Sequence, residues 1–203
     1  MRLMLAVVLV CVLAYTALHQ LTEGFTALTA ETSRRNQIAA QPKVLPEVQV
    51  LARDATIQPL SSIFRDDGRV LIVNFIYTRC ITLCLAMGAE LQQLQERIVE
   101  QGLSDEVRIV SLSFDPRDTA DQLQRYSHLM RAQTGVWDFY TLHDTQQREA
   151  LLKAFGIVVI PAPYDEFVHN AAYHVVLPDG KLSYIVDEGQ APTALAYALQ
   201  QVP

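Results

Sequence analysis

The sequence predicts an α/β fold in which a central mixed sheet carries helices on both faces. Val70–Tyr77 is a nearly continuous run of apolar, β-branched and aromatic residues, which is typical of a strand buried on both faces. A helical pattern and a second strand, Val107–Phe114, follow, and this order indicates a parallel right-handed crossover. Ala171–Leu177 and Lys181–Val186 flank the turn sequence Pro178–Gly180, which predicts an antiparallel hairpin.

The N-terminal residues 1–20 predict an export segment. Arg2 is followed by the uncharged apolar run Leu3–Leu18, whose length lies between a signal-peptide core and a full membrane span. A buried core helix is disfavoured because the run starts at residue 3 and is apolar all round. No clean A-x-A cleavage site follows, so we favour a retained anchor, with Arg2 in the cytoplasm and the remainder outside. The expected location is a bacterial-type inner membrane with the domain facing the periplasm, or an equivalent exported compartment.

Residues 21–46 are expected to form a juxtamembrane linker, and residues 47–203 the folded domain. Half of the 203 residues are hydrophobic, which suffices for a full core. The net charge of -6 argues against a nucleic-acid partner, because phosphate binding requires a basic surface.

Helices are expected between the strands. One follows the first strand and ends near Gly102, and a second covers about Thr119–Arg131. Asp144, with Gln147 three residues later, predicts the N-terminus of a third helix that stops at Gly156. The last helix begins near Pro192.

The chemistry of the chain is concentrated at Cys80 and Cys84, which lie between the end of the first strand and the start of a helix. Ligand sites in open α/β sheets lie at such strand ends. The positive end of the helix dipole, together with neighbouring Arg79, favours the thiolate, which is both a nucleophile and a metal ligand. Cys11 lies within the apolar run and is expected to be inert.

Three interpretations of the pair remain open from the residues alone: a structural disulfide, a redox pair and a metal site. A disulfide between residues four apart closes a very small loop, so its entropic stabilisation is only roughly 2 kcal/mol. Two thiolates are soft ligands that favour Cu(I) or Zn²⁺. A third ligand would come from elsewhere in the fold, and we expect a histidine.

Four histidines follow the apolar segment. His128, within a helix, and His143, just before a helix, are expected at the solvated surface. His169 and His174 flank the start of the predicted hairpin and would face opposite sides of a regular strand, so at most one of them points towards the cysteines. The residues alone do not choose between these two.

The segments VNFIYTRCITLC, SFDPRDT, LLKAFGI and HNAAYHVVLPDGKL resemble the SCO/SenC family of copper-binding, thioredoxin-like proteins. The resemblance covers about Val70–Gly189 and implies a thioredoxin-like, peroxiredoxin-like fold. The family carries C-x-x-x-C after its central strand and a histidine nine residues before the proline of a P-D-G turn, a register that selects His169.

The resemblance implies that Cys80, Cys84 and His169 bind one copper ion. Asp115 matches the aspartate of the family's D-P segment and is a weaker candidate for an outer supporting residue. Family members usually have proline after each cysteine, where this chain has Ile81 and Leu85. This difference bears on copper affinity and redox potential, while the ligand types are intact.

Family members are implicated in delivering copper to the CuA site of cytochrome c oxidase subunit II. The resemblance therefore implies a non-enzymatic copper chaperone whose partner is that subunit or another copper or thiol protein. For this function we expect a three-coordinate, partly exposed site, which would allow ligand exchange. The alternative is a thiol–disulfide oxidoreductase that uses Cys80 and Cys84 as a redox pair. A thiol peroxidase is disfavoured because Thr78 is one residue too close to Cys80 for T-x-x-C, and a copper or redox sensor is a fourth possibility.

Overall fold

The computed structural model describes residues 2–22, 24–25, 29–80, 83–142 and 144–202. The chain divides into two compact units, Met1–Gln41 and Pro42–Pro203. The first unit contains helices α1 (Arg2–Leu21) and α2 (Ala30–Ala40), and the side chain of Thr29 caps α2. Helix α1 has a mean hydropathy of 2.0 and is long and apolar enough to cross a membrane, a test that a signal sequence also passes.

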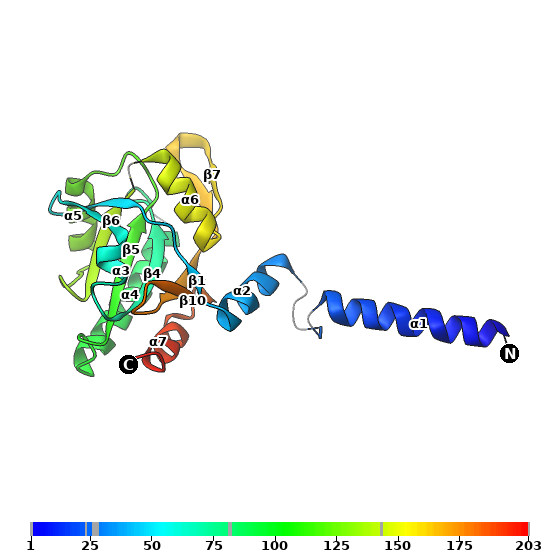
Figure 1. The fold of residues 1–203 in the computed structure, drawn as a ribbon. Helices are drawn as coiled ribbons and strands as arrows, with labels where there is room; N and C mark the ends of the chain where they lie inside the picture. The colour runs from blue at the N-terminus through cyan, green and yellow to red at the C-terminus, as the bar shows by residue number, and fades with distance from the viewer. Residues whose placement is uncertain (1, 23, 26–28, 81–82, 143, 203) are drawn as a thin grey trace. The chain divides into compact units, whose positions relative to one another are not determined.

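The second unit is built on an eight-stranded mixed sheet with the order β1-β10-β9-β4-β5-β6-β2-β3. Its centre consists of the parallel strands β4 (Val70–Ile76), β5 (Val107–Ser113) and β6 (Trp137–Thr141). The antiparallel hairpin β9 (Ala172–Val176) and β10 (Lys181–Asp187) joins β4 on one side (Figure 1). Every residue of β4 is buried, as expected for a strand covered on both faces.

The remaining strands are short. The edges of the sheet are β1 (Lys43–Val44) and β3 (Ile57–Pro59), and β2 (Gln49–Ala52) connects β3 to β6. A separate two-stranded sheet consists of β7 (Val159–Pro161) and β8 (Phe167–His169).

Helices cover both faces of the sheet. Helices α4 (Leu83–Glu100) and α7 (Ala191–Leu199) contact each other on one face. Helix α5 (Ala120–Leu129) lies beside α4, and the Tyr126 hydroxyl of α5 donates a hydrogen bond to the Cys84 carbonyl of α4. The other face carries α3 (Leu60–Phe64) and α6 (Thr145–Phe155). There the Phe155 ring packs edge-on against Phe64 and Phe75.

Local sequence explains where several helices begin and end. The Asp144 side chain accepts a hydrogen bond from the Gln147 N–H, as predicted for the start of α6. Gly156 ends α6 in the left-handed conformation, at φ 73°. Thr119 and Gln122 form a capping box at the start of α5.

The predicted fold class, the crossover and the closing hairpin are confirmed. The sequence did not predict β2, β3, β6 or the β7–β8 pair. Strand β1 and helix α2 lie inside segment 21–46, which was expected to be a linker. The division of the chain at residues 20 and 46 stays a prediction.

Candidate functional site

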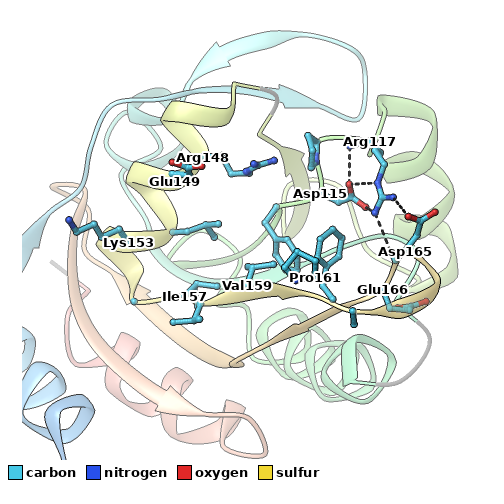
Figure 2. A pocket seen from close by; sticks show the side chains of 17 residues that line it. Asp115, Arg117, Arg148, Glu149, Lys153, Ile157, Val159, Pro161, Asp165 and Glu166 are labelled. Atoms are coloured by element: carbon cyan, nitrogen blue, oxygen red, sulfur yellow. Dashed lines mark hydrogen bonds and ion pairs between the residues drawn. The ribbon is translucent and has the colours of Figure 1, made fainter.

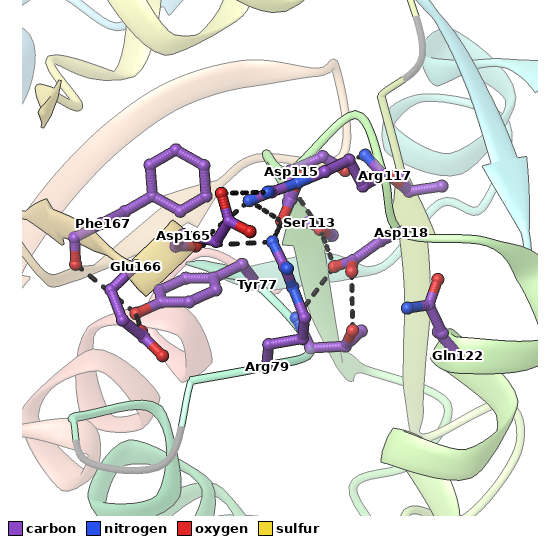
Figure 3. Close-up of polar contacts among 12 residues, drawn as sticks. Tyr77, Arg79, Ser113, Asp115, Arg117, Asp118, Gln122, Asp165, Glu166 and Phe167 are labelled. Carbon is purple, nitrogen blue, oxygen red and sulfur yellow. Dashed lines mark hydrogen bonds and ion pairs between the residues drawn. The ribbon is translucent and has the colours of Figure 1, made fainter. Parts of the chain in front are cut away.

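The loop that carries Cys80 leaves the carboxyl end of β4 and is held by a buried carboxylate. Asp118 is fully buried and accepts hydrogen bonds from the Thr78 N–H at 2.8 Å and the Thr78 hydroxyl at 2.6 Å. The Ser113 hydroxyl, at the end of β5, donates to the same carboxylate at 2.5 Å. Asp118 therefore fixes the backbone just before the first cysteine (Figure 3).

The two cysteines lie close together, are buried and are not joined by a disulfide bond. The Cys84 N–H donates to the Cys80 sulfur at 3.3 Å, and the two residues are 4% (Cys80) and 1% (Cys84) exposed. The interaction with the Cys80 side chain, followed by burial, raises the pKa of the Cys84 thiol. The raised pKa of Cys84 runs against the expectation of a thiolate at this position, because the neighbouring sulfur and the loss of solvent both favour the protonated thiol. The two thiols are also more enclosed than expected for a partly exposed site, whereas His169 is partly exposed.

Tyr77 lies between the thiol loop and His169. Burial, the hydrogen bond to Glu166 and the proximity of Cys80 together raise the pKa of the Tyr77 phenol. Its hydroxyl donates to the Glu166 carboxylate at 2.5 Å. The His169 ring packs edge-on against Tyr77, with ring centroids 6.1 Å apart, and against Phe114, with centroids 4.9 Å apart. One aromatic residue thus contacts both the sulfur and the imidazole.

The histidines separate clearly. His169 is partly exposed at the end of β8, where Nδ1 lies 3.0 Å from the Asn170 carbonyl oxygen, and its Nε2 is buried without a hydrogen-bond partner among the described residues. His174 is 1% exposed in β9 and packs between Phe75 and Phe155 in the core. His128 is exposed on α5, as expected, and His143 lies outside the described residues.

Asp115 lies at the end of β5 and is fully buried. The Arg79 guanidinium donates to its Oδ2 at 2.7 Å, and Arg117 donates to its Oδ1 at 2.9 Å and its Oδ2 at 3.1 Å (Figure 3). Burial alone would raise the pKa of Asp115, but the hydrogen bonds from Arg117 and Arg79 outweigh burial and lower it. The positive charge of Arg79 is therefore paired with the Asp115 carboxylate, and it is shared between that carboxylate and the neighbouring thiols.

A groove of about 790 Å³ runs between α6 and the β7–β8 hairpin (Figure 2). Its walls include Phe114, Leu152, Ile157, Val159 and Phe167, and charged side chains lie at its ends. The groove leaves the hairpin loosely packed against α6 on this side.

The residues present fit a soft metal ion, because they offer two thiols and a buried imidazole nitrogen that has no hydrogen-bond partner within the described ranges of the chain. The structure brings Cys80 and Cys84 together. It does not place His169 in the same cluster: among the described residues, no group of three or more His, Cys, Asp or Glu side chains is arranged to hold a metal ion. Three-ligand binding would require the imidazole and the sulfurs to approach each other past Tyr77.

Sequence reasoning missed several residues of this region. Tyr77 and Asp118 stand inside the motifs already singled out, three residues before Cys80 and three after Asp115, so proximity along the chain was the available signal. Arg117 and Glu166 gain their importance from the path of the β7–β8 hairpin, which no local pattern indicated. Ile81 lies outside the described residues, and Leu85 is on α4 with 37% of its surface exposed.

The fold and the site together define a thioredoxin-like protein with a cysteine pair between the central strand and the following helix. Residues 63–202 match the sequence model of the SCO1/SenC family, and the chain belongs to this family. It is 34% identical over 118 residues to the SCO1 protein homolog of Bacillus subtilis (strain 168). That match covers 57% of this chain and 60% of the relative.

Solved structures share the fold. A SCO1/SenC family lipoprotein from Bacillus anthracis superimposes with a TM-score of 0.69 at 20% identity, covering 79% of this chain and 96% of that one. BsSco, described as a member of the Sco family of cytochrome c oxidase assembly proteins with a disulfide switch, gives 0.66 at 25% identity, covering 79% and 94%. Arabidopsis thaliana ScoI, solved with copper bound, gives 0.66 at 14% identity, covering 78% and 97%. The expected thioredoxin-like fold is confirmed.

Proposed function

We propose that this protein is a copper chaperone of cytochrome c oxidase assembly that holds Cu(I) on Cys80, Cys84 and His169. Two observations carry the proposal: the two buried thiols are paired, and His169, which packs against Tyr77, has an Nε2 without a hydrogen-bond partner in the described part of the chain. Membership of the SCO1/SenC family and the copper-bound relative support the choice of copper. The copper ion is the cargo rather than a permanent cofactor.

The finer parts of the proposal concern delivery and location. The acceptor would be the CuA site of cytochrome c oxidase subunit II, or another copper or thiol protein. Helix α1 would anchor the chain in a bacterial-type inner membrane, with the domain in the periplasm or an equivalent exported compartment. Because the cysteines are buried, transfer would require the thiol loop to open so that acceptor ligands can replace its sulfurs one at a time.

Copper titration of the reduced protein tests the proposal. We expect one Cu(I) per chain, and a loss of affinity by orders of magnitude in Cys80→Ser and Cys84→Ser. The Cu(II) form should show a thiolate-to-copper absorption band. His128→Ala is the matched control for His169→Ala, because His128 is exposed on α5 and far along the chain from the thiols. A reduced protein that binds no copper would refute the proposal.

A thiol–disulfide oxidoreductase is the second candidate. The contact between the Cys84 N–H and the Cys80 sulfur brings the two residues close enough for a redox pair, and the disulfide switch described for BsSco concerns a relative at 25% identity. His169→Ala separates the candidates, since metal transfer depends on the imidazole and thiol exchange does not. Reductase activity that survives in His169→Ala, in a protein that binds no copper, would favour the second candidate.

A further inference from the structure

We propose that Arg117 is a positioning residue that latches the hairpin arm, defined as residues 159–169, against the end of β5 and so controls how His169 approaches copper. This inference rests on the proposed function. The latch consists of Arg117, Arg79, Asp115 and Asp165.

The hairpin arm is not part of the eight-stranded sheet. Its strands β7 and β8 pair only with each other among the described strands, and the cross-strand pair Ile160 and Val168 is exposed. At its base, the Asn170 side chain accepts from the Val158 N–H at 2.7 Å and donates to the Gly156 carbonyl at 3.0 Å. Side-chain contacts therefore hold the arm where a central strand would have a main-chain ladder.

The tip of the arm has a conformation that needs support. Tyr164 and Asp165 both adopt the left-handed region, with φ 63° each, which is unfavourable for residues with a Cβ. The Asp165 carbonyl accepts from Arg117 Nη2 at 3.2 Å, and its carboxylate pairs with Arg117 Nη1 at 3.2 Å. Arg117 thus binds the tip through both the main chain and the side chain (Figure 3).

The Arg117 guanidinium also binds Asp115, which follows strand β5 of the central sheet. Its two hydrogen bonds to the Asp115 carboxylate form a bidentate pair, which is the stronger and more directional kind of arginine contact. The Arg117 guanidinium carbon also lies 5.4 Å from the centroid of the Phe167 ring in β8. One side chain therefore connects the end of β5, the tip of the arm and the strand that ends at His169.

One residue of the latch, Arg79, directly precedes Cys80 in the chain. Arg79, the neighbour of Cys80, donates to the same Asp115 carboxylate at 2.7 Å and lies 3.5 Å from the same Asp165 carbonyl. The chain segment next to Cys80 and the hairpin arm therefore share the Asp115 carboxylate and the Asp165 carbonyl as contacts, so a movement of either one changes the contacts of the other. The groove between the arm and α6 leaves room for displacement (Figure 2). The latch accordingly restricts the positions of the arm, and so the path along which the imidazole can approach the sulfurs past Tyr77.

Arg117→Gln in the full-length, reduced protein in detergent micelles tests the latch. The matched control is Arg97→Gln, which removes the same charge from an exposed position on α4. In copper-free protein we expect faster hydrogen exchange in peptides covering residues 157–170 for Arg117→Gln and unchanged exchange for Arg97→Gln. Asp165→Asn, which keeps the carbonyl contacts, should give an intermediate effect.

Cu(I) affinity, measured by competition with a chelator, supplies the second readout. Residues that orient a metal ligand typically change affinity about 10–100-fold, so Arg117→Gln should weaken binding about 10-fold. In the His169→Ala background the same substitution should cause no further loss, because the latch acts through the imidazole. Equal losses in both backgrounds, or unchanged exchange in the arm, would overturn the inference. If the wild-type chain binds no Cu(I), the proposed function and the role of the latch in copper binding are both refuted, and the exchange data alone judge whether Arg117 holds the arm.

Discussion

Replacement of Asp118 by alanine should destabilise the domain by about 3 kcal/mol. The buried carboxylate accepts three hydrogen bonds from Thr78 and Ser113, and a bond to a charged acceptor contributes about 1.5–3 kcal/mol. Their sum of roughly 4.5–9 kcal/mol is offset by several kcal/mol, because the variant no longer buries a charge. At about 2–4 °C per kcal/mol, the melting temperature should fall by roughly 6–12 °C.

Urea unfolding followed by fluorescence measures this change. Trp137 is the single tryptophan and is 1% exposed, so it reports the loss of the core. Asp105→Ala is the matched control, because Asp105 is exposed, and its effect should stay within about 0.5 kcal/mol. An Asp118→Ala variant as stable as this control would refute the view that the carboxylate holds the thiol loop.

Three further predictions concern other parts of the domain. Burial raises the pKa of Asp67, but its two arginine partners outweigh burial and lower it, so its stabilising effect is full above about pH 4 and is lost as pH falls through the lower folded pKa. Asp67→Asn should therefore flatten the stability profile below about pH 4 in acid-unfolding experiments, and an unchanged profile would contradict this. Gly180→Ala should destabilise the domain by about 1–3 kcal/mol in thermal melts, because φ at this position is 79° and the new Cβ would lie 2.5 Å from Arg65 Cγ. An unchanged melting temperature would show that the turn relaxes freely. Alkylation of Cys84, measured by mass spectrometry, should be slow at pH 8 and faster in Cys80→Ala, because the Cys80 side chain is the main cause of the raised pKa of Cys84. Equal rates in the two proteins would show that Cys80 does not raise this pKa.

Sequence patterns predicted those parts of the fold whose cause is local. The apolar run of β4 and the Asp144 and Gly156 boundaries of α6 carry their own signals. Strand β6 was missed because Asp138 interrupts its apolar pattern. That carboxylate is tolerated in a buried strand only because Arg53 and Arg108, distant in sequence, pair with it.

The candidate site divides in the same way. Cys80 and Cys84 were predictable because their spacing and their place after a buried strand are local features. The residues alone left His169 and His174 open, and the register of the family resemblance was needed to choose between them. Arg117 could not be recognised, because its contact with Asp165 depends on how a hairpin 48 residues away folds back.

The terminal strands of the eight-stranded sheet bear on solubility. One edge strand, Lys43–Val44, is only two residues long and begins with a charged side chain. The other, Ile57–Pro59, is three residues long and ends with a proline, which has no N–H to donate to a hydrogen bond. Each therefore offers a neighbouring molecule little main chain on which to extend the ladder. The folded domain should resist fibril-like association through these two borders even when it is crowded at high local concentration.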